Sequence, residues 1–199
     1  MKLVAVFAAS LLSVAALAQS TTVETETVTA GLLGKRYVAA GFGWSDYNHT
    51  GTDGLGVGLD LNLPVHTNID LSLNYGYSWL EGATEVGHVL NAAVTGYITR
   101  GEYKPYLTLS TGYVWANRRF DSDHGVWGAE AGIERAVNDK ISSTFSVGYD
   151  DDFRNHGEGL WDVSIGGTYN FTDKLVGTAE VSYIEYGTIG YNVGVAFRF

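Results

Sequence analysis

The sequence contains no cysteine, which excludes disulfide bridges, thiol catalysis, cysteine-ligated zinc and a lipid-modified cysteine anchor. Proline is scarce, at 2 residues, and charged residues make up 17% of the chain, below the roughly 25% of ordinary soluble domains. The net charge of −10 argues against nucleic acid as a partner, because phosphates require a basic surface. Glycine is abundant instead, at 26 residues, and aromatic side chains reach 13%. This composition is unusual for a soluble domain.

Long hydrophobic runs are missing after the first 18 residues. Residues 1–18 read as a secretory signal peptide, with a positive start at Lys2, an apolar run over 3–15 and a small-x-small cleavage site ending at Ala18. The apolar run is shorter than the ~18–20 residues that a membrane helix needs. We therefore expect export with cleavage near Ala18. Residues 19–34 are rich in Thr and Glu without a sustained apolar period, and we expect them to form a loose periplasmic leader.

From residue 35 to residue 199 the sequence is a succession of segments in which apolar and polar or small residues alternate. Alternation with a period of two places the apolar side chains on one face of a β-strand. The clearest segment carries Leu55, Val57, Leu59, Leu61, Leu63 and Val65 on one face. We count ten such segments, each long enough for a tilted membrane strand of about 9–11 residues. A count of eight, with two hairpins misread, is the alternative.

The expected connections between these strands fall into two classes. Short turns are predicted at 64–68, 100–103, 138–140 and 172–174. Longer, acidic loops are predicted at 45–53, 117–124 and 150–159, with shorter connections on the same side at 80–84 and 185–188. Short turns on one rim and longer loops on the other are typical of membrane β-barrels, whose short turns face the periplasm.

Alternation by itself also fits a soluble β-sandwich, so two further observations separate the possibilities. The non-apolar faces carry mainly Gly, Ser, Thr, Asn and Ala, as in Ser142, Thr144, Ser146 and Gly148, and small residues suit the interior of a narrow barrel. All tryptophans also fall near the longer loops on the apolar face, where they predict an outer aromatic girdle at the membrane–water interface. These girdle residues are Trp44, Trp79, Trp115, Trp127 and Trp161. We therefore predict an all-β fold, a transmembrane antiparallel β-barrel over 35–199.

The last segment resembles a family-specific motif. Its outward residues are Tyr191, Val193, Val195, Phe197 and Phe199. An amphipathic closing strand that ends in Phe is similar to that of bacterial outer-membrane barrels, and the architecture resembles the OmpA/OmpX/Opa type. The resemblance implies that these residues are an assembly signal for the barrel assembly machinery. It also implies periplasmic chaperones, outer-membrane lipid and lipopolysaccharide as partners, and a monomer without a cofactor. Those relatives have eight strands, so ten strands is a departure from them.

Charged residues fall on the inward face of several predicted strands. They are Asp60, Asp70, Glu130, Glu134, Asp162, Glu180 and Arg198. Carboxylates inside a barrel must be paired, hydrated or protonated, because burying a bare charge is costly. One interpretation is a polar network that fills the lumen, with Arg198 pairing with Glu134 or Glu180. The other is an acidic constriction that prefers cations.

The predicted loops also contain carboxylates and imidazoles, but these match no EF-hand or HExxH pattern, so we expect no metal site. Omptin-like proteases use Asp and His at the outer rim, and Asp123 and His124 stand there in this chain. The lipid A deacylases carry a His-x-Ser element that is absent here. We expect a non-enzymatic barrel, structural or porin-like with a narrow lumen. The alternative is a surface adhesin that binds through its acidic loops, and an enzyme ranks last.

Overall fold

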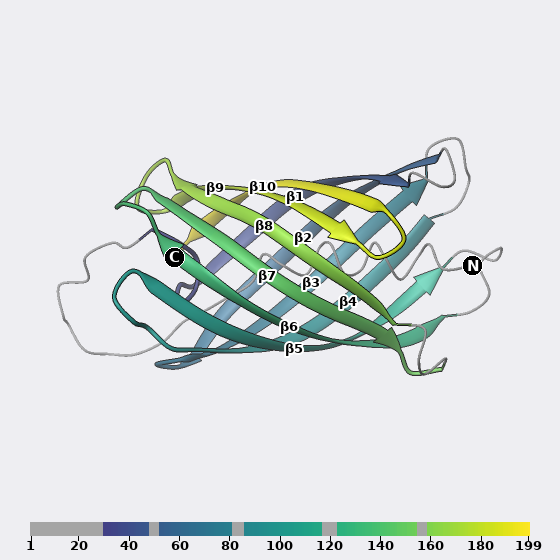
Figure 1. Ribbon diagram of the computed structural model, residues 1–199, viewed down its shortest axis with the longest axis horizontal. Helices are drawn as coiled ribbons and strands as arrows, with labels where there is room; N and C mark the ends of the chain where they lie inside the picture. The colour runs from purple at the N-terminus through teal and green to yellow at the C-terminus, as the bar shows by residue number, and fades with distance from the viewer. Residues whose placement is uncertain (1–29, 48–51, 81–85, 117–122, 155–158) are drawn as a thin grey trace.

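The computed structural model describes residues 30–47, 52–80, 86–116, 123–154 and 159–199. Within them, ten antiparallel strands form one closed barrel in which each strand pairs with its neighbours in the chain and β1 closes on β10 (Figure 1). The strands are β1 (Tyr37–Tyr47), β2 (Thr52–His66), β3 (Ile69–Leu80), β4 (Val86–Tyr97), β5 (Tyr103–Ala116), β6 (His124–Ala136), β7 (Ile141–Asp152), β8 (Leu160–Asn170), β9 (Leu175–Ile184) and β10 (Thr188–Arg198). The ten-strand prediction is confirmed, and the eight-strand alternative is wrong. Among the described residues, no helix is long and apolar enough to cross a membrane.

The two ends of the barrel carry different connections. At one end, which we call the short-turn end, β1 begins, β10 ends and the turns 67–68, 98–102, 137–140 and 171–174 join the strands. At the opposite end, which we call the loop end, β1, β3, β5 and β7 end, β2, β4, β6 and β8 begin, and the turn 185–187 joins β9 to β10. Several strands run further than the sequence pattern predicts, and β7 takes in Asp150 and Asp152. Placing these residues in a loop was wrong, because strand pairing with β6 continues through the acidic run.

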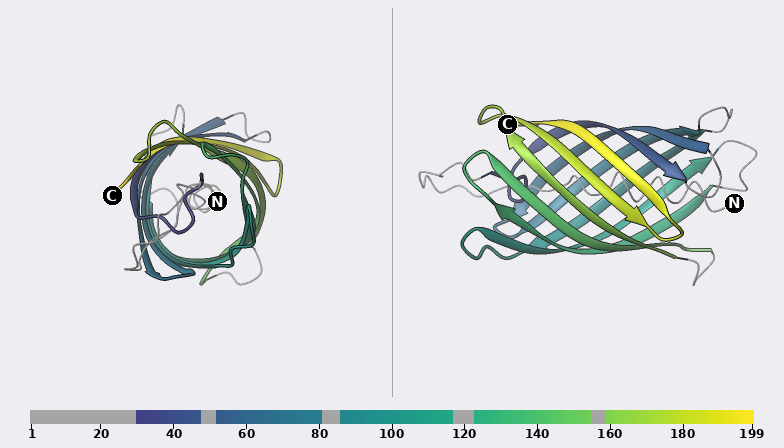
Figure 2. Two further views of the ribbon diagram at one scale, coloured as in Figure 1. Left: turned by 90° about the vertical axis from the view of Figure 1, so that its left-hand side faces the viewer. Right: turned by 45° about the horizontal axis from the view of Figure 1, so that its top comes forward.

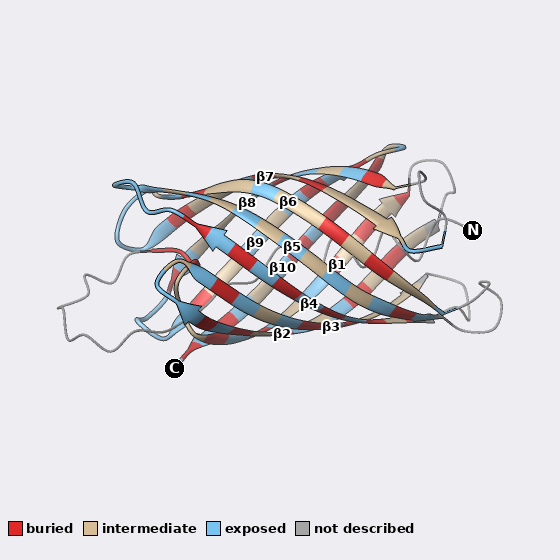
Figure 3. Cartoon of the chain, turned by 90° about the horizontal axis from the view of Figure 1, so that it is seen from below, coloured by how far each residue is buried: buried red, intermediate tan, exposed pale blue. Residues whose placement is uncertain are grey.

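The barrel is apolar outside and polar inside, the reverse of a soluble β-sandwich. Leu59 is 60% exposed, whereas its neighbour Asp60 is 7% exposed. Figure 3 shows this alternation of exposed and buried residues along the strands around the barrel. Soluble monomers rarely expose contiguous apolar patches larger than a few hundred Å². A closed barrel with an apolar outer face is the fold of outer-membrane-type barrels, because closure pairs every backbone group and leaves only side chains for lipid.

The interior is polar over most of its length but carries apolar side chains at both ends. Val89, Val114 and Val126 form a buried cluster near the loop end. Leu33 packs on Tyr97 near the short-turn end. These inward apolar residues were not predicted, because the valines interrupt faces that otherwise consist of small and polar residues and Leu33 lies outside the strands. They narrow any passage through the barrel.

Candidate lumen site

All seven charged residues predicted to face the lumen do lie on the inward face of their strands. Asp60, Asp70, Glu134 and Arg198 are buried, and Glu130, Asp162 and Glu180 are half-buried. They come from β2, β3, β6, β8, β9 and β10, so the closure of the barrel gathers them in one interior. Their role as a network or a constriction stays a prediction.

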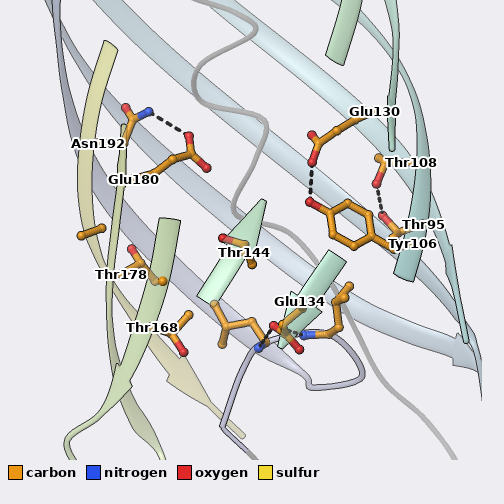
Figure 4. Close-up of a pocket in the computed structure, with 14 residues that line it drawn as sticks. Thr95, Tyr106, Thr108, Glu130, Glu134, Thr144, Thr168, Thr178, Glu180 and Asn192 are labelled. Atoms are coloured by element: carbon orange, nitrogen blue, oxygen red, sulfur yellow. Dashed lines mark hydrogen bonds between the residues drawn. The ribbon is translucent and has the colours of Figure 1, made fainter. Parts of the chain in front are cut away.

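Three of these carboxylates, Glu130, Glu134 and Glu180, line one cavity with a volume of about 60 Å³ (Figure 4). The Tyr106 hydroxyl donates a hydrogen bond to Glu130 Oε1 at 2.6 Å, and Asn192 Nδ2 donates to Glu180 Oε1 at 3.3 Å. Threonine hydroxyls complete much of the wall, from Thr95, Thr108, Thr144, Thr168 and Thr178. A cavity lined by carboxylates and hydroxyls offers oxygen atoms to a cation, and its ionised carboxylates repel an anion.

A second group of carboxylates lies next to this cavity, toward the loop end. Glu130, Asp150 and Asp162 line a smaller cavity on β6, β7 and β8. Glycine makes room for them in the wall, because a Cβ added at Gly128 would overlap Asp150 Oδ1 and one at Gly148 would overlap Asp162 Oδ1. In the part of the chain that the structure describes, no group of three or more His, Cys, Asp or Glu side chains is arranged to hold a metal ion.

At the short-turn end the charges are paired differently from the prediction. Glu134 forms an ion pair with Lys104, at 3.5 Å between Oε1 and Nζ. Arg198 instead donates from Nη2 to the backbone oxygen of Gly31 at 2.6 Å and to Asn170 Oδ1 at 3.0 Å. Both cations thus lie among polar partners at this one end of the lumen. The expected pairing of Arg198 with Glu134 or Glu180 gives way because Lys104 stands directly opposite Glu134 in the β5–β6 register.

The residues before β1 do not form a loose leader over their last part. Ala30, Gly31, Leu32 and Leu33 are buried inside the short-turn end of the barrel, against Glu134. Residues 19–29, the rest of the predicted leader, and the signal peptide over 1–18 lie outside the described residues. Tertiary contacts, which leave no local pattern in the sequence, decide the position of residues 30–33.

On the outer face, the tryptophans lie near the loop end of their strands and contact tyrosine rings. Trp44 stacks on Tyr191 with ring centroids 5.0 Å apart, and Tyr149 contacts both Trp127 and Trp161 at 5.7 and 4.9 Å. Trp79 and Trp115 contact Tyr77 and Tyr113 on their own strands. This arrangement is compatible with the predicted aromatic girdle, whose depth in a membrane stays a prediction.

Sequence reasoning missed three inward residues. Lys104 and Tyr106 were not assigned to the inward face, although both lie on it in β5, which starts at Tyr103 and continues through Pro105. Asp150 was assigned to a loop because it begins an acidic run. Extending the alternation in both directions would have found all three. The loop segments 117–122 and 155–158, on which a surface-binding function would depend, lie outside the described residues.

No family model matches the sequence, and no curated protein matches it either. Among solved structures, the chain is similar to the KdgM porin in complex with disordered oligogalacturonate, at 8% identity over 82% of this chain and 99% of that chain, with a TM-score of 0.48. It is also similar to the NanC porin, at 10% identity over 82% and 100% of the two chains, with a TM-score of 0.47. Neisserial surface protein A (NspA) matches at 14% identity over 82% and 97%, with a TM-score of 0.45. The more specific resemblance to the OmpA/OmpX/Opa type stays a prediction.

Proposed function

We propose that this chain is a non-enzymatic outer-membrane barrel whose narrow, acidic lumen admits small cations and disfavours anions. The observation that carries the proposal is the set of inward carboxylates between the middle of the barrel and the loop end: Glu130, Asp150, Asp162 and Glu180. The inward cations Lys104 and Arg198 lie at the short-turn end and already have polar partners there. The field in the middle of the lumen is therefore negative, and rings of carboxylates favour cations in narrow pores.

The size of the barrel supports a narrow passage rather than an open channel. Interiors of eight-stranded barrels are filled by side chains, whereas barrels of sixteen or more strands leave aqueous channels. Ten strands fall close to the filled limit, and the Val89, Val114 and Val126 cluster occupies part of the loop end. Such a lumen can pass only ions and small solutes.

The apolar outer face of the barrel supports the outer membrane as the location. Apolar residues such as Leu59, Ile165 and Val193 have no protein partner that covers them in the barrel, being 60%, 64% and 57% exposed. Outer-membrane lipid and lipopolysaccharide are the partners that would cover this face. The assembly signal at Tyr191, Val193, Val195, Phe197 and Phe199 is part of the same proposal.

Ion selectivity tests the proposal. The chain without residues 1–18 is refolded into a planar bilayer, and the reversal potential is measured across a KCl gradient. We expect cation selectivity that falls markedly in Glu130→Gln and further in the double variant with Glu180→Gln. Glu102→Gln is the control, because it removes the same charge from an exposed ion pair with Arg135 outside the lumen. An anion-selective current, or equal selectivity in all variants, would refute an acidic lumen.

A further inference from the structure

Residues 30–34 occupy the mouth of the barrel at its short-turn end. The end-on view shows this segment curling inside the ring of strands before it joins β1 (Figure 2). Ala30, Leu32 and Leu33 are 1%, 7% and 6% exposed, and they belong to no strand. Leu32 and Leu33 also line the cavity that holds Glu130 and Glu180. The segment thus forms the floor of the cavity on the short-turn side.

The barrel wall holds this segment by its backbone. Glu134 Oε2 accepts hydrogen bonds from the backbone N–H groups of Leu32 at 2.8 Å and Leu33 at 3.4 Å. Lys104 Nζ donates to the carbonyl oxygen of Leu33 at 2.7 Å, and Arg198 Nη2 donates to that of Gly31 at 2.6 Å. Charged side chains from β5, β6 and β10 therefore satisfy backbone groups that a strand would pair in its ladder.

Glycine is required at position 31 for this fit. Its φ of +105° lies in the region that side chains with a Cβ rarely adopt, and an added Cβ would overlap the Glu134 carboxylate. Gly101, in the β4–β5 turn at the same end, also has a positive φ, of +61°, but no atom lies within 4 Å of its added Cβ. The two glycines share the backbone requirement, and only Gly31 fits against the Glu134 carboxylate.

We propose that residues 30–34 are a displaceable plug that closes the short-turn mouth of the lumen, with Glu134 and Lys104 as its latch. The plug is attached covalently only through Lys35 to the barrel and contributes no ladder bond to it, so it can leave while the ten-strand sheet stays closed. Its release opens the cavity floor formed by Leu32 and Leu33. The effect on ion passage rests on the proposed function, but the displacement itself does not.

Cysteine labelling tests the displacement without any need for conduction. The chain has no cysteine, so Leu33→Cys introduces a single buried reporter. The rate of its reaction with a water-soluble maleimide is measured in the refolded chain. Leu33→Cys is tested alone and in combination with Gly31→Ala, Glu134→Gln or Gly101→Ala. Loss of hydrogen bonds to a charged group shifts an equilibrium by about tenfold or more, so we expect at least about tenfold faster labelling with Gly31→Ala and with Glu134→Gln. Gly101→Ala should leave the rate within about twofold.

Heat-modifiable migration on gels verifies that each variant has folded, and Glu134→Gln keeps the test open if Gly31→Ala does not fold. Unit conductance is then measured for the same variants. Faster labelling together with a larger conductance supports both the plug and the pore. Faster labelling without any conductance supports the plug and refutes cation passage. Unchanged labelling in both Gly31→Ala and Glu134→Gln overturns the plug, whatever the conductance.

Discussion

Replacing Lys104 with methionine removes the cation that faces Glu134 while keeping most of the length of the side chain and an apolar stem. The two charges lie 3.5 Å apart, and the Glu134 and Lys104 side chains are 4% and 16% exposed. At that distance the attraction is about 5 kcal/mol for an effective dielectric constant of about 20, against about 1 kcal/mol in water. Removing one partner of a buried pair typically costs about 3–5 kcal/mol, because the other charge remains buried without compensation. We expect Lys104→Met to lower the free energy of unfolding by about 3 kcal/mol. This is the lower end of that range, because the cavity beside Glu134 has room for water that can hydrate the remaining charge.

The chain supplies a matched control close by, because Arg135 follows Glu134 on β6 and Glu102 lies in the β4–β5 turn, two residues before Lys104. Arg135 and Glu102 are also 3.5 Å apart at the short-turn end, but their side chains are 49% and 63% exposed. Exposed pairs contribute about 0–1 kcal/mol, so Arg135→Met should cost less than about 1 kcal/mol. Urea unfolding of the refolded chain in lipid vesicles, followed by tryptophan fluorescence, measures both values. Equal losses in the two variants would show that burial does not set the strength of the Lys104–Glu134 pair and would refute this reasoning.

Three further predictions use the same unfolding assay. Tyr106→Phe removes the 2.6 Å hydrogen bond to Glu130 and should cost about 1.5–3 kcal/mol, and a loss below about 0.5 kcal/mol would mean that water replaces the hydroxyl. Asn138→Ala removes an acceptor for two backbone N–H groups of the β6–β7 turn, at 2.8 and 3.0 Å, and should cost about 1 kcal/mol. Asn138→Asp keeps the acceptor, so its free energy of unfolding should stay close to that of the unchanged chain. Leu59→Arg, in the middle of β2, should cost about 2–4 kcal/mol in a bilayer. Val65→Arg, near the short-turn end of the same strand, should cost about 0–1 kcal/mol. Equal costs would argue against lipid contact at Leu59.

The strands and their faces could be predicted from the sequence because a period of two is a local signal. Leu59 and Asp60 are adjacent in the sequence, and the alternation alone assigns them to opposite faces of the wall. The same parity placed Glu134 and Arg198 inside. The strand ends were less certain, since an acidic run such as that beginning at Asp150 resembles a loop until its pairing with β6 is known.

The partners of the inward charges could not be predicted from the sequence. Glu134 and the backbone N–H group of Leu32 are 102 positions apart, and no periodicity in either segment signals their contact. Lys104 was not among the inward charges predicted from the sequence, although it lies on the inward face of β5, and Pro105 on the outward face leaves the strand intact. Contacts of this kind depend on how the whole barrel closes, which the local pattern does not encode.

The lumen proposals require that lipid covers the apolar outer face and that the interior of the barrel is shielded from lipid. The tryptophans are natural reporters of this, because all 5 lie on the outer face near the loop end. The measurement is the quenching of tryptophan fluorescence by phospholipids brominated at known depths, on the refolded chain and on variants that keep one tryptophan each. We expect strong quenching in every variant, greatest for bromine close to the headgroups and at one common depth. Weak quenching that does not depend on depth, or depths scattered through the bilayer, would contradict it.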